Sequence, residues 1–98
     1  DLQLKNNSLT RIKHFYFQYA IDLHYLDLSH NKIQFIEPKS LTQTTKLNYL
    51  DLSFNQLEYL NENIFIDIEN DQFNTFDVSL INILILNNNR LKYFDIQG

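Results

Sequence analysis

The chain has 98 residues and contains no cysteine, no methionine and no tryptophan, with one glycine and one proline. Without cysteine, disulfide bridges and cysteine-ligated zinc are excluded within these residues. The single glycine, Gly98, leaves no glycine-rich loop that could cradle a phosphate. No run of 18 or more apolar residues is present, so no stretch has the length of a membrane-spanning helix. A chain of this length allows one domain, and we expect it to make no membrane contact.

Positive charge is also scarce, with 8 Lys and Arg against 12 Asp and Glu, a net charge of −4. A surface that follows nucleic-acid phosphates carries the opposite sign, so we expect no nucleic-acid partner. His14, His24 and His30 form no cluster with metal-ligand spacing, and no serine lies in a G-x-S-x-G motif. Asp27 and Asp51 would be neighbours only on an open surface, without the burial that tunes a catalytic acid. We therefore expect no enzyme activity, no cofactor and no metal.

An internal repeat organises the sequence. Residues 23–33, 47–57 and 81–91 each fit L-x-x-L-x-L-x-x-N-x-L, with isoleucine in place of leucine at positions 33 and 81, and a shortened copy occupies residues 2–9. The fixed asparagines are Asn7, Asn31, Asn55 and Asn89, so they follow one another at intervals of 24, 24 and 34 residues. A single unit of this kind cannot bury its own apolar side, whereas stacked units can.

The pattern resembles the leucine-rich repeat family over nearly the whole chain. A 24-residue repeat is similar to the class found mostly in extracellular proteins, including Toll-type receptor ectodomains and secreted immune proteins. The resemblance implies an α/β fold: a solenoid, or horseshoe segment, with short parallel strands on its concave face and a mostly irregular or short-helix convex face. It implies about four repeats: 1–22 (partial), 23–46, 47–80 (with an insert near 66–79) and 81–98 (partial). Because both ends fall inside a repeat, we expect a fragment of a longer protein.

Residue spacing alone predicts the same core. Leu26 and Leu28 are two positions apart, so on a strand they point to one face, as do their equivalents in the other repeats. A second apolar set recurs on the return path, five and ten residues after the asparagines: Ile12, Ile36, Leu60 and Phe94, then Phe17, Leu41 and Phe65. We expect these residues in the core, carried by single helical turns, 3₁₀ pieces and extended chain.

The repeated asparagines (Asn7, Asn31, Asn55 and Asn89) occupy the bend at the end of each predicted strand. A buried amide side chain supplies two donors and a carbonyl acceptor. It can therefore satisfy backbone groups of its own bend and of the neighbouring turn of chain. We expect a ladder of buried structural asparagines.

Residues between the core leucines should point outward, onto the concave face. The candidate binding residues there are Tyr25, Asp27, His30, Tyr49, Asp51, Phe54, Ile83, Ile85 and Asn87. Leu-Asp-Leu-Ser is common in the family, so the family consensus is enough to explain Asp27 and Asp51 without a specific binding contact. Exposed aromatic and aliphatic side chains are the anchors that protein interfaces favour. The plain alternative is that tyrosines suit a sheet surface.

The ten extra residues of the last interval fall in 66–79, which holds Asp67, Glu69, Asp71 and Asp77 and no basic residue. Three interpretations are open: a surface loop, an acidic protrusion that grips a basic partner, and a calcium site. Against the calcium site, these carboxylates lack the glycine-containing spacing of a calcium-binding loop.

Two functions of different class follow. The first is a recognition segment of an extracellular receptor or secreted immune protein, which binds a protein partner or ligand on the concave face and can form a homodimer or heterodimer. The second is a cytoplasmic scaffold or regulatory segment. Asn6 opens an Asn-Asn-Ser triplet, a glycosylation acceptor that favours the first.

Overall fold

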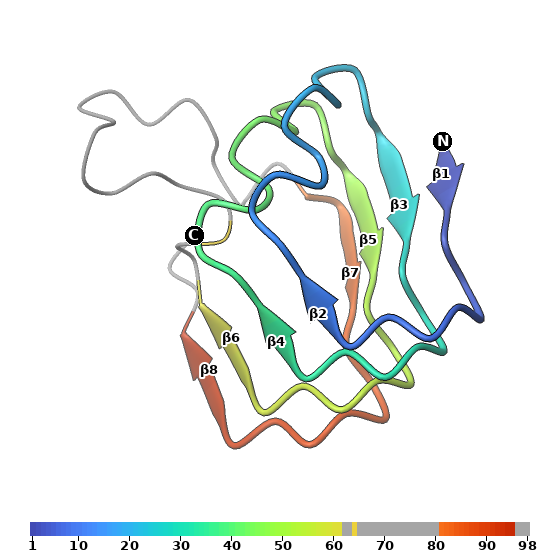
Figure 1. The fold of residues 1–98 in the computed structure, drawn as a ribbon, viewed down its shortest axis with the longest axis vertical. Coiled ribbons are helices and arrows are strands. Elements are labelled where there is room, and N and C mark those ends of the chain that lie inside the picture. The colour runs from blue at the N-terminus through green and yellow to red at the C-terminus, as the bar shows by residue number, and fades with distance from the viewer. Residues whose placement is uncertain (62–63, 65–80, 96–98) are drawn as a thin grey trace.

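The computed structural model describes residues 1–61, 64 and 81–95 of the chain. Its strands are short, and within each sheet they run parallel to one another (Figure 1). Their bounds are β1 Leu2–Gln3, β2 Arg11–Ile12, β3 Tyr25–Asp27, β4 Phe35–Ile36, β5 Tyr49–Asp51, β6 Tyr59–Asn61, β7 Ile83–Ile85 and β8 Tyr93–Asp95.

The larger sheet has four parallel strands in the order β1-β3-β5-β7. Leu26 pairs with Leu50, 24 residues later, and Leu50 pairs with Leu84, 34 residues later. The longer last interval therefore leaves the register of the sheet unchanged. Equivalent positions of the repeat face one another across the sheet, so each outward column is a ladder of near neighbours.

A second row of strands lies on the return path, where β2 pairs with β4 and β6 pairs with β8, again in parallel (Figure 1). We expected a mostly irregular or short-helix face here, made of single helical turns, 3₁₀ pieces and extended chain. The part of the chain that the structure describes has extended chain and turns but contains no α-helix. Residues 14–19 and 38–43 are turns, and Ile64 lies in a 3₁₀ element. The α component of the expected α/β fold is therefore missing from these residues. Aromatic and β-branched residues favour an extended backbone, and stacking aligns them for pairing.

The core fills the space between the two rows of strands, where the repeat places its apolar residues. Leu26, Leu50 and Leu60 are at most 2% exposed. The other buried apolar side chains are Ile12, Phe17, Leu23, Leu28, Ile33, Ile36, Leu41, Leu47, Leu52, Leu57 and Ile64. This confirms the predicted core in the middle repeats, and the equivalent leucines of the first and last strands, Leu2, Leu4, Leu84 and Leu86, are partly buried and pack against it. The side chains of Phe65 and Phe94, and the acidic segment 66–79, lie outside the described residues.

The repeated asparagines tie each turn of chain to the one before it. The Nδ2 of Asn55 donates to the carbonyl oxygens of Leu28, Leu52 and Ser53, at 3.0 to 3.1 Å, and its Oδ1 accepts from the amide of Ile33 at 3.0 Å. Asn31 and Asn89 make equivalent bonds across the turns.

Asn7 differs from this pattern, because its side chain is exposed and bonds only locally, to the carbonyls of Leu4 and Lys5. The expectation of a buried amide is wrong for Asn7.

Candidate binding face

The outward side of the four-stranded sheet carries two stacked aromatic pairs. Alternation along β3 and β5 turns Tyr25 and Tyr49 away from the core, and the parallel register places them opposite one another. Their ring centroids are 4.1 Å apart and their planes differ by 8°. A hydrogen bond with Tyr49 raises the pKa of Tyr25 above its ordinary value, and burial and the carboxylates of Asp27 and Asp51 add to the rise. The pair forms a half-buried aromatic surface.

The second pair, His30 and Phe54, follows the ends of β3 and β5. Its ring centroids are 4.3 Å apart and its planes differ by 9°, and both side chains are exposed. Each residue has a φ of 56°, in the left-handed region, where a Cβ atom crowds the following carbonyl. Asn6 and Asn88 occupy the equivalent positions with φ near 60°, and asparagine tolerates this conformation far better than phenylalanine does.

Backbone pairing across the turns holds the strained bends in place. The amide of His30 donates to the carbonyl of Ser53 at 3.0 Å, and that of Phe54 donates to Asn87 at 3.0 Å. A bulky residue in this conformation costs on the order of 1–2 kcal/mol, which the surrounding bonds must offset.

The two aspartates of the sheet are committed to their own bends. Oδ1 of Asp27 accepts from the backbone amide of Ser29 at 2.9 Å and from its hydroxyl at 2.6 Å, and Asp51 makes the same bonds with Ser53. Asp27 is 7% exposed and Asp51 is half-buried. Both carboxylates are therefore engaged within their own chain segment, because short side chains at a bend bond to the nearest backbone donors.

The remaining predicted face residues extend the aromatic surface along β7. Ile83 pairs with Tyr49 and is 47% exposed, while Ile85 pairs with Asp51 and is half-buried. Asn87 follows the strand and is exposed. The structure therefore brings the predicted aromatic and aliphatic residues together on one face, which we call the sheet face: Tyr25, His30, Tyr49, Phe54 and Ile83.

Comparison with known proteins matches residues 1–57 to the leucine-rich repeat family, described as leucine rich repeat. The match covers more than half of the chain. This chain belongs to the leucine-rich repeat family. No curated protein and no solved structure matches it. Leucine-rich repeats are typically non-catalytic and serve as protein-interaction modules, so the family accounts for a binding role in general terms.

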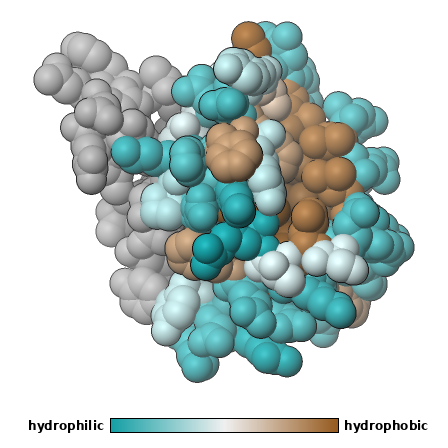
Figure 2. Space-filling model, viewed as in Figure 1, coloured by the Kyte–Doolittle hydropathy of each residue, from teal (hydrophilic) through white to brown (hydrophobic). Residues whose placement is uncertain are grey.

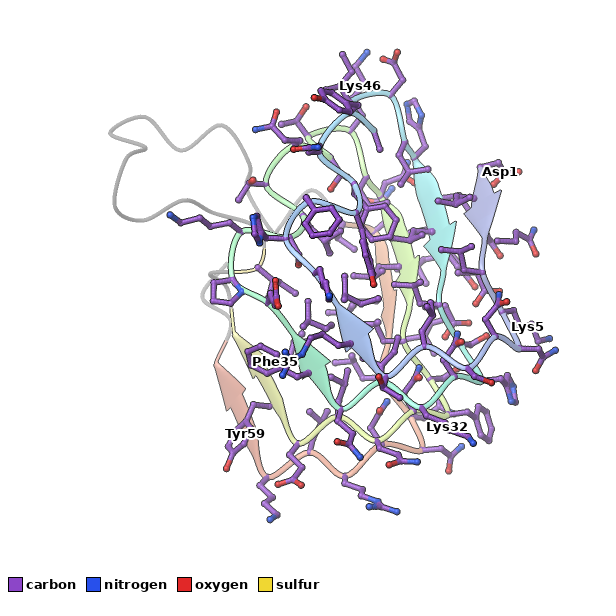
Figure 3. The ribbon with its side chains drawn as sticks, viewed as in Figure 1. Asp1, Lys5, Lys32, Phe35, Lys46 and Tyr59 are labelled. Carbon is purple, nitrogen blue, oxygen red and sulfur yellow. The ribbon has the colours of Figure 1, made fainter. Side chains whose placement is uncertain are left out.

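Aromatic side chains also gather on the return side of the repeats, which the sequence patterns did not single out. The exposed aromatic residues there are Phe15, Tyr16, Tyr19, Phe35 and Tyr59, and Ile21 is also exposed. Phe35 and Tyr59 project outward from β4 and β6 (Figure 3). Both directly precede a core residue of the return path, Ile36 or Leu60. Strand alternation from those core positions would have placed them outside.

The repeat segment offers no metal centre in its described residues, where no three His, Asp or Glu side chains gather. Glu37 is engaged by His14, whose amide donates at 2.9 Å and whose ring Nδ1 lies 3.2 Å away. These bonds hold the pKa of Glu37 below its ordinary value, with a further small contribution from Arg11.

Among the described residues, no helix is long and apolar enough to span a membrane.

Proposed function

We propose that this leucine-rich repeat segment recognises a protein partner through the sheet face. The observation that carries the proposal is the pair of aromatic stacks, Tyr25 with Tyr49 and His30 with Phe54, beside exposed Ile83. Aromatic residues that are already stacked lose little side-chain entropy on binding, and they are enriched at the energetic centres of interfaces.

The backbone of the second stack supports this assignment. Asparagine fits the left-handed bend at positions 6 and 88, whereas positions 30 and 54 carry rings at a conformational cost. Backbone strain at His30 and Phe54 motivates a functional hypothesis, because asparagine at these two positions would preserve the fold with less strain. A ring at these bends adds an exposed contact surface that asparagine cannot supply.

Peptides selected for binding to the protein test the proposal. A displayed peptide library is panned on the immobilised protein, and the affinities of enriched peptides are measured by calorimetry. Tyr49→Ala and Phe54→Ala should each weaken binding by about tenfold or more, the range typical of interface anchors. Tyr19→Ala is the control, because Tyr19 is 86% exposed on the return side. Equal affinities for all four proteins would overturn the proposal, provided that each variant unfolds cooperatively.

A second copy of the chain is another occupant for the sheet face. Phe54 and Ile83, 45% and 47% exposed, offer an apolar surface that a copy could cover. Sedimentation equilibrium distinguishes the two cases, since self-association would weaken in Phe54→Ala and Ile83→Asn but not in Tyr19→Ala.

We further propose that the segment belongs to a horseshoe-shaped solenoid of an extracellular receptor or secreted immune protein. The 24-residue interval supports this, and so does Asn6, whose exposed side chain opens an Asn-Asn-Ser triplet. The alternative is a cytoplasmic scaffold. Protein isolated from its natural source should lose mass on enzymatic deglycosylation, with Asn6 converted to aspartate. Unmodified Asn6 in protein recovered from the cytosol would favour the scaffold.

A further inference from the structure

A surface pocket of about 430 Å³ lies on the return side of the repeats, away from the sheet face. Its walls come from the chain leading into and out of β2 and from the start of β4. They are Ser8, Leu9, Thr10, Arg11, Lys13, Tyr16, Gln34 and Phe35. The volume falls within the range of small-ligand pockets.

The pocket is positively charged, because Arg11 and Lys13 line it and no acidic residue does. Lys13 has no ion-pair partner among residues 1–61, 64 and 81–95. Arg11 is only weakly compensated: its Nη1 lies 3.9 Å from Oε2 of Glu37, a carboxylate whose closer bonds go to His14. An arginine with uncommitted donors can bind an oxyanion through two parallel hydrogen bonds.

Aromatic rings accompany these charges. The guanidinium of Arg11 lies 5.3 Å from the ring centroid of Phe35, and Tyr16 lines the same pocket. Phe35 and Tyr16 are each 44% exposed, so their rings are open to a ligand. Figure 2 shows hydrophilic side chains over β2 and β4 bordered by hydrophobic ones, the mixed surface that an amphipathic ligand requires. The hydroxyls of Ser8 and Thr10 make no hydrogen bond within the described part of the chain and can donate to an anion.

Backbone hydrogen bonds hold the segments that line the pocket in place. The amides of Lys32 and Gln34 donate to the carbonyls of Leu9 and Thr10, each at 2.9 Å, and the amide of Tyr16 donates to Lys13 at 3.1 Å. A prearranged pocket loses less entropy when it binds a ligand.

We propose that this pocket is a second binding site, which takes a phosphate or sulfate ester carried on an aromatic ring. Arg11 and Lys13 bind the oxyanion, Ser8 and Thr10 add hydrogen bonds, and the aryl group packs against Tyr16 and Phe35. A tyrosine residue esterified by phosphate or sulfate on a partner protein would present this group. The site does not depend on the proposed role of the sheet face.

Nuclear magnetic resonance titration tests the site with four probes: phenyl phosphate, phenyl sulfate, inorganic phosphate and phenol. We expect saturable shifts at the amides of Lys13, Tyr16 and Phe35 with either ester, and at least about fivefold weaker binding of inorganic phosphate and of phenol, since each lacks half of the contacts. The two esters separate phosphate from sulfate preference. Absence of saturable shifts, or shifts centred on other residues, would overturn the proposal.

Variants separate a built site from general attraction of anions. Lys13→Gln should weaken ester binding about tenfold, and Arg11→Lys should weaken it while keeping the charge, because lysine cannot form the two parallel bonds. Lys5→Gln is the matched control, an exposed lysine that does not line the pocket. Equal losses in Lys13→Gln and Lys5→Gln would show nonspecific electrostatics and reject the site. Each variant must retain the cooperative unfolding of the parent protein, as surface substitutions normally do.

Discussion

The ring of Tyr25 lies face to face with that of Tyr49, and the hydrogen bond between the pair raises the pKa of Tyr25. The two residues come from adjacent strands at equivalent repeat positions, so the repeat interval itself creates the stack. Both proposed binding surfaces therefore depend on stacked repeats: the sheet face combines residues of β3, β5 and β7, and the pocket combines residues beside β2 and β4.

Replacing Tyr49 by phenylalanine should lower the pKa of Tyr25 toward its ordinary value of 10.0. The substitution keeps the stacked ring but removes the hydroxyl that hydrogen-bonds with Tyr25, which is the largest cause of the raised pKa. Tyrosine labelled with ¹³C at Cζ resolves the individual titrations by nuclear magnetic resonance. Tyr19→Phe, which removes a remote phenol, should leave the curve of Tyr25 in place. An unchanged curve in Tyr49→Phe would contradict the assigned cause.

Asn55→Leu should lower the free energy of unfolding by about 3 kcal/mol, because several buried backbone groups lose their partner. Asn7→Leu is the matched comparison within the same repeat position. Its exposed side chain bonds only to nearby carbonyls, so the expected loss is below about 1 kcal/mol. Urea unfolding measures both, and equal losses would argue against the cross-turn bonds as the source of stability.

Asn88→Val should destabilise the protein by about 1–2 kcal/mol, since a β-branched residue is poorly accommodated at a φ of 60°. Asn88→Gly should change the stability by less than about 1 kcal/mol, because glycine adopts this conformation freely but also loosens the unfolded chain. The neighbouring exposed residue provides the control: Asn87→Val should have little effect. Thermal unfolding monitored by circular dichroism distinguishes the three variants. An Asn88→Val protein as stable as the parent protein would contradict the bend geometry.

The contribution of Glu37 to stability should depend on pH. Its pKa is lower in the folded protein than its ordinary value of 4.5, so the folded state favours the carboxylate. The stabilisation is therefore complete above about pH 4.5 and is lost as the pH falls through the folded-state pKa. The difference in melting temperature between the parent protein and Glu37→Gln should shrink as acid is added below that point. Arg11→Gln should preserve most of the dependence, since the bonds from His14 are the larger cause.

The leucine and asparagine spacing predicted the core and the stacked strands because those features follow from local periodicity. Leu26, Leu50 and Leu60 had to be buried once strands of period two were stacked. The pairing of β2 with β4 was harder to foresee, because two-residue strands carry no pattern of their own and form only when neighbouring turns align. The burial of Asp27 depended on a bond to Ser29 that spacing alone does not reveal.

The sequence indicated some of the residues that form the two proposed binding surfaces. Tyr25 and Tyr49 were identified from strand alternation, while the left-handed bend at His30 and Phe54 was not, because bulky residues ordinarily avoid it. Phe35 was missed because the repeat pattern marks only the buried member of each return strand and not its outward neighbour. The pocket beside β2 combines residues from two turns of chain, and such combinations become visible only in three dimensions.

The asparagine bonds also give the molecule a mechanical direction. Asn31, Asn55 and Asn89 each reach back to a carbonyl of the preceding turn, and the carbonyls of Leu28 and Leu52 each receive two such amides. A force that pulls the chain apart from one end must therefore break the same asparagine hydrogen bonds at each of these turns. Under tension the chain would extend in discrete steps of one repeat. A load applied at one end would be transmitted through the row of asparagine side-chain amides, each of which makes the same kind of bond.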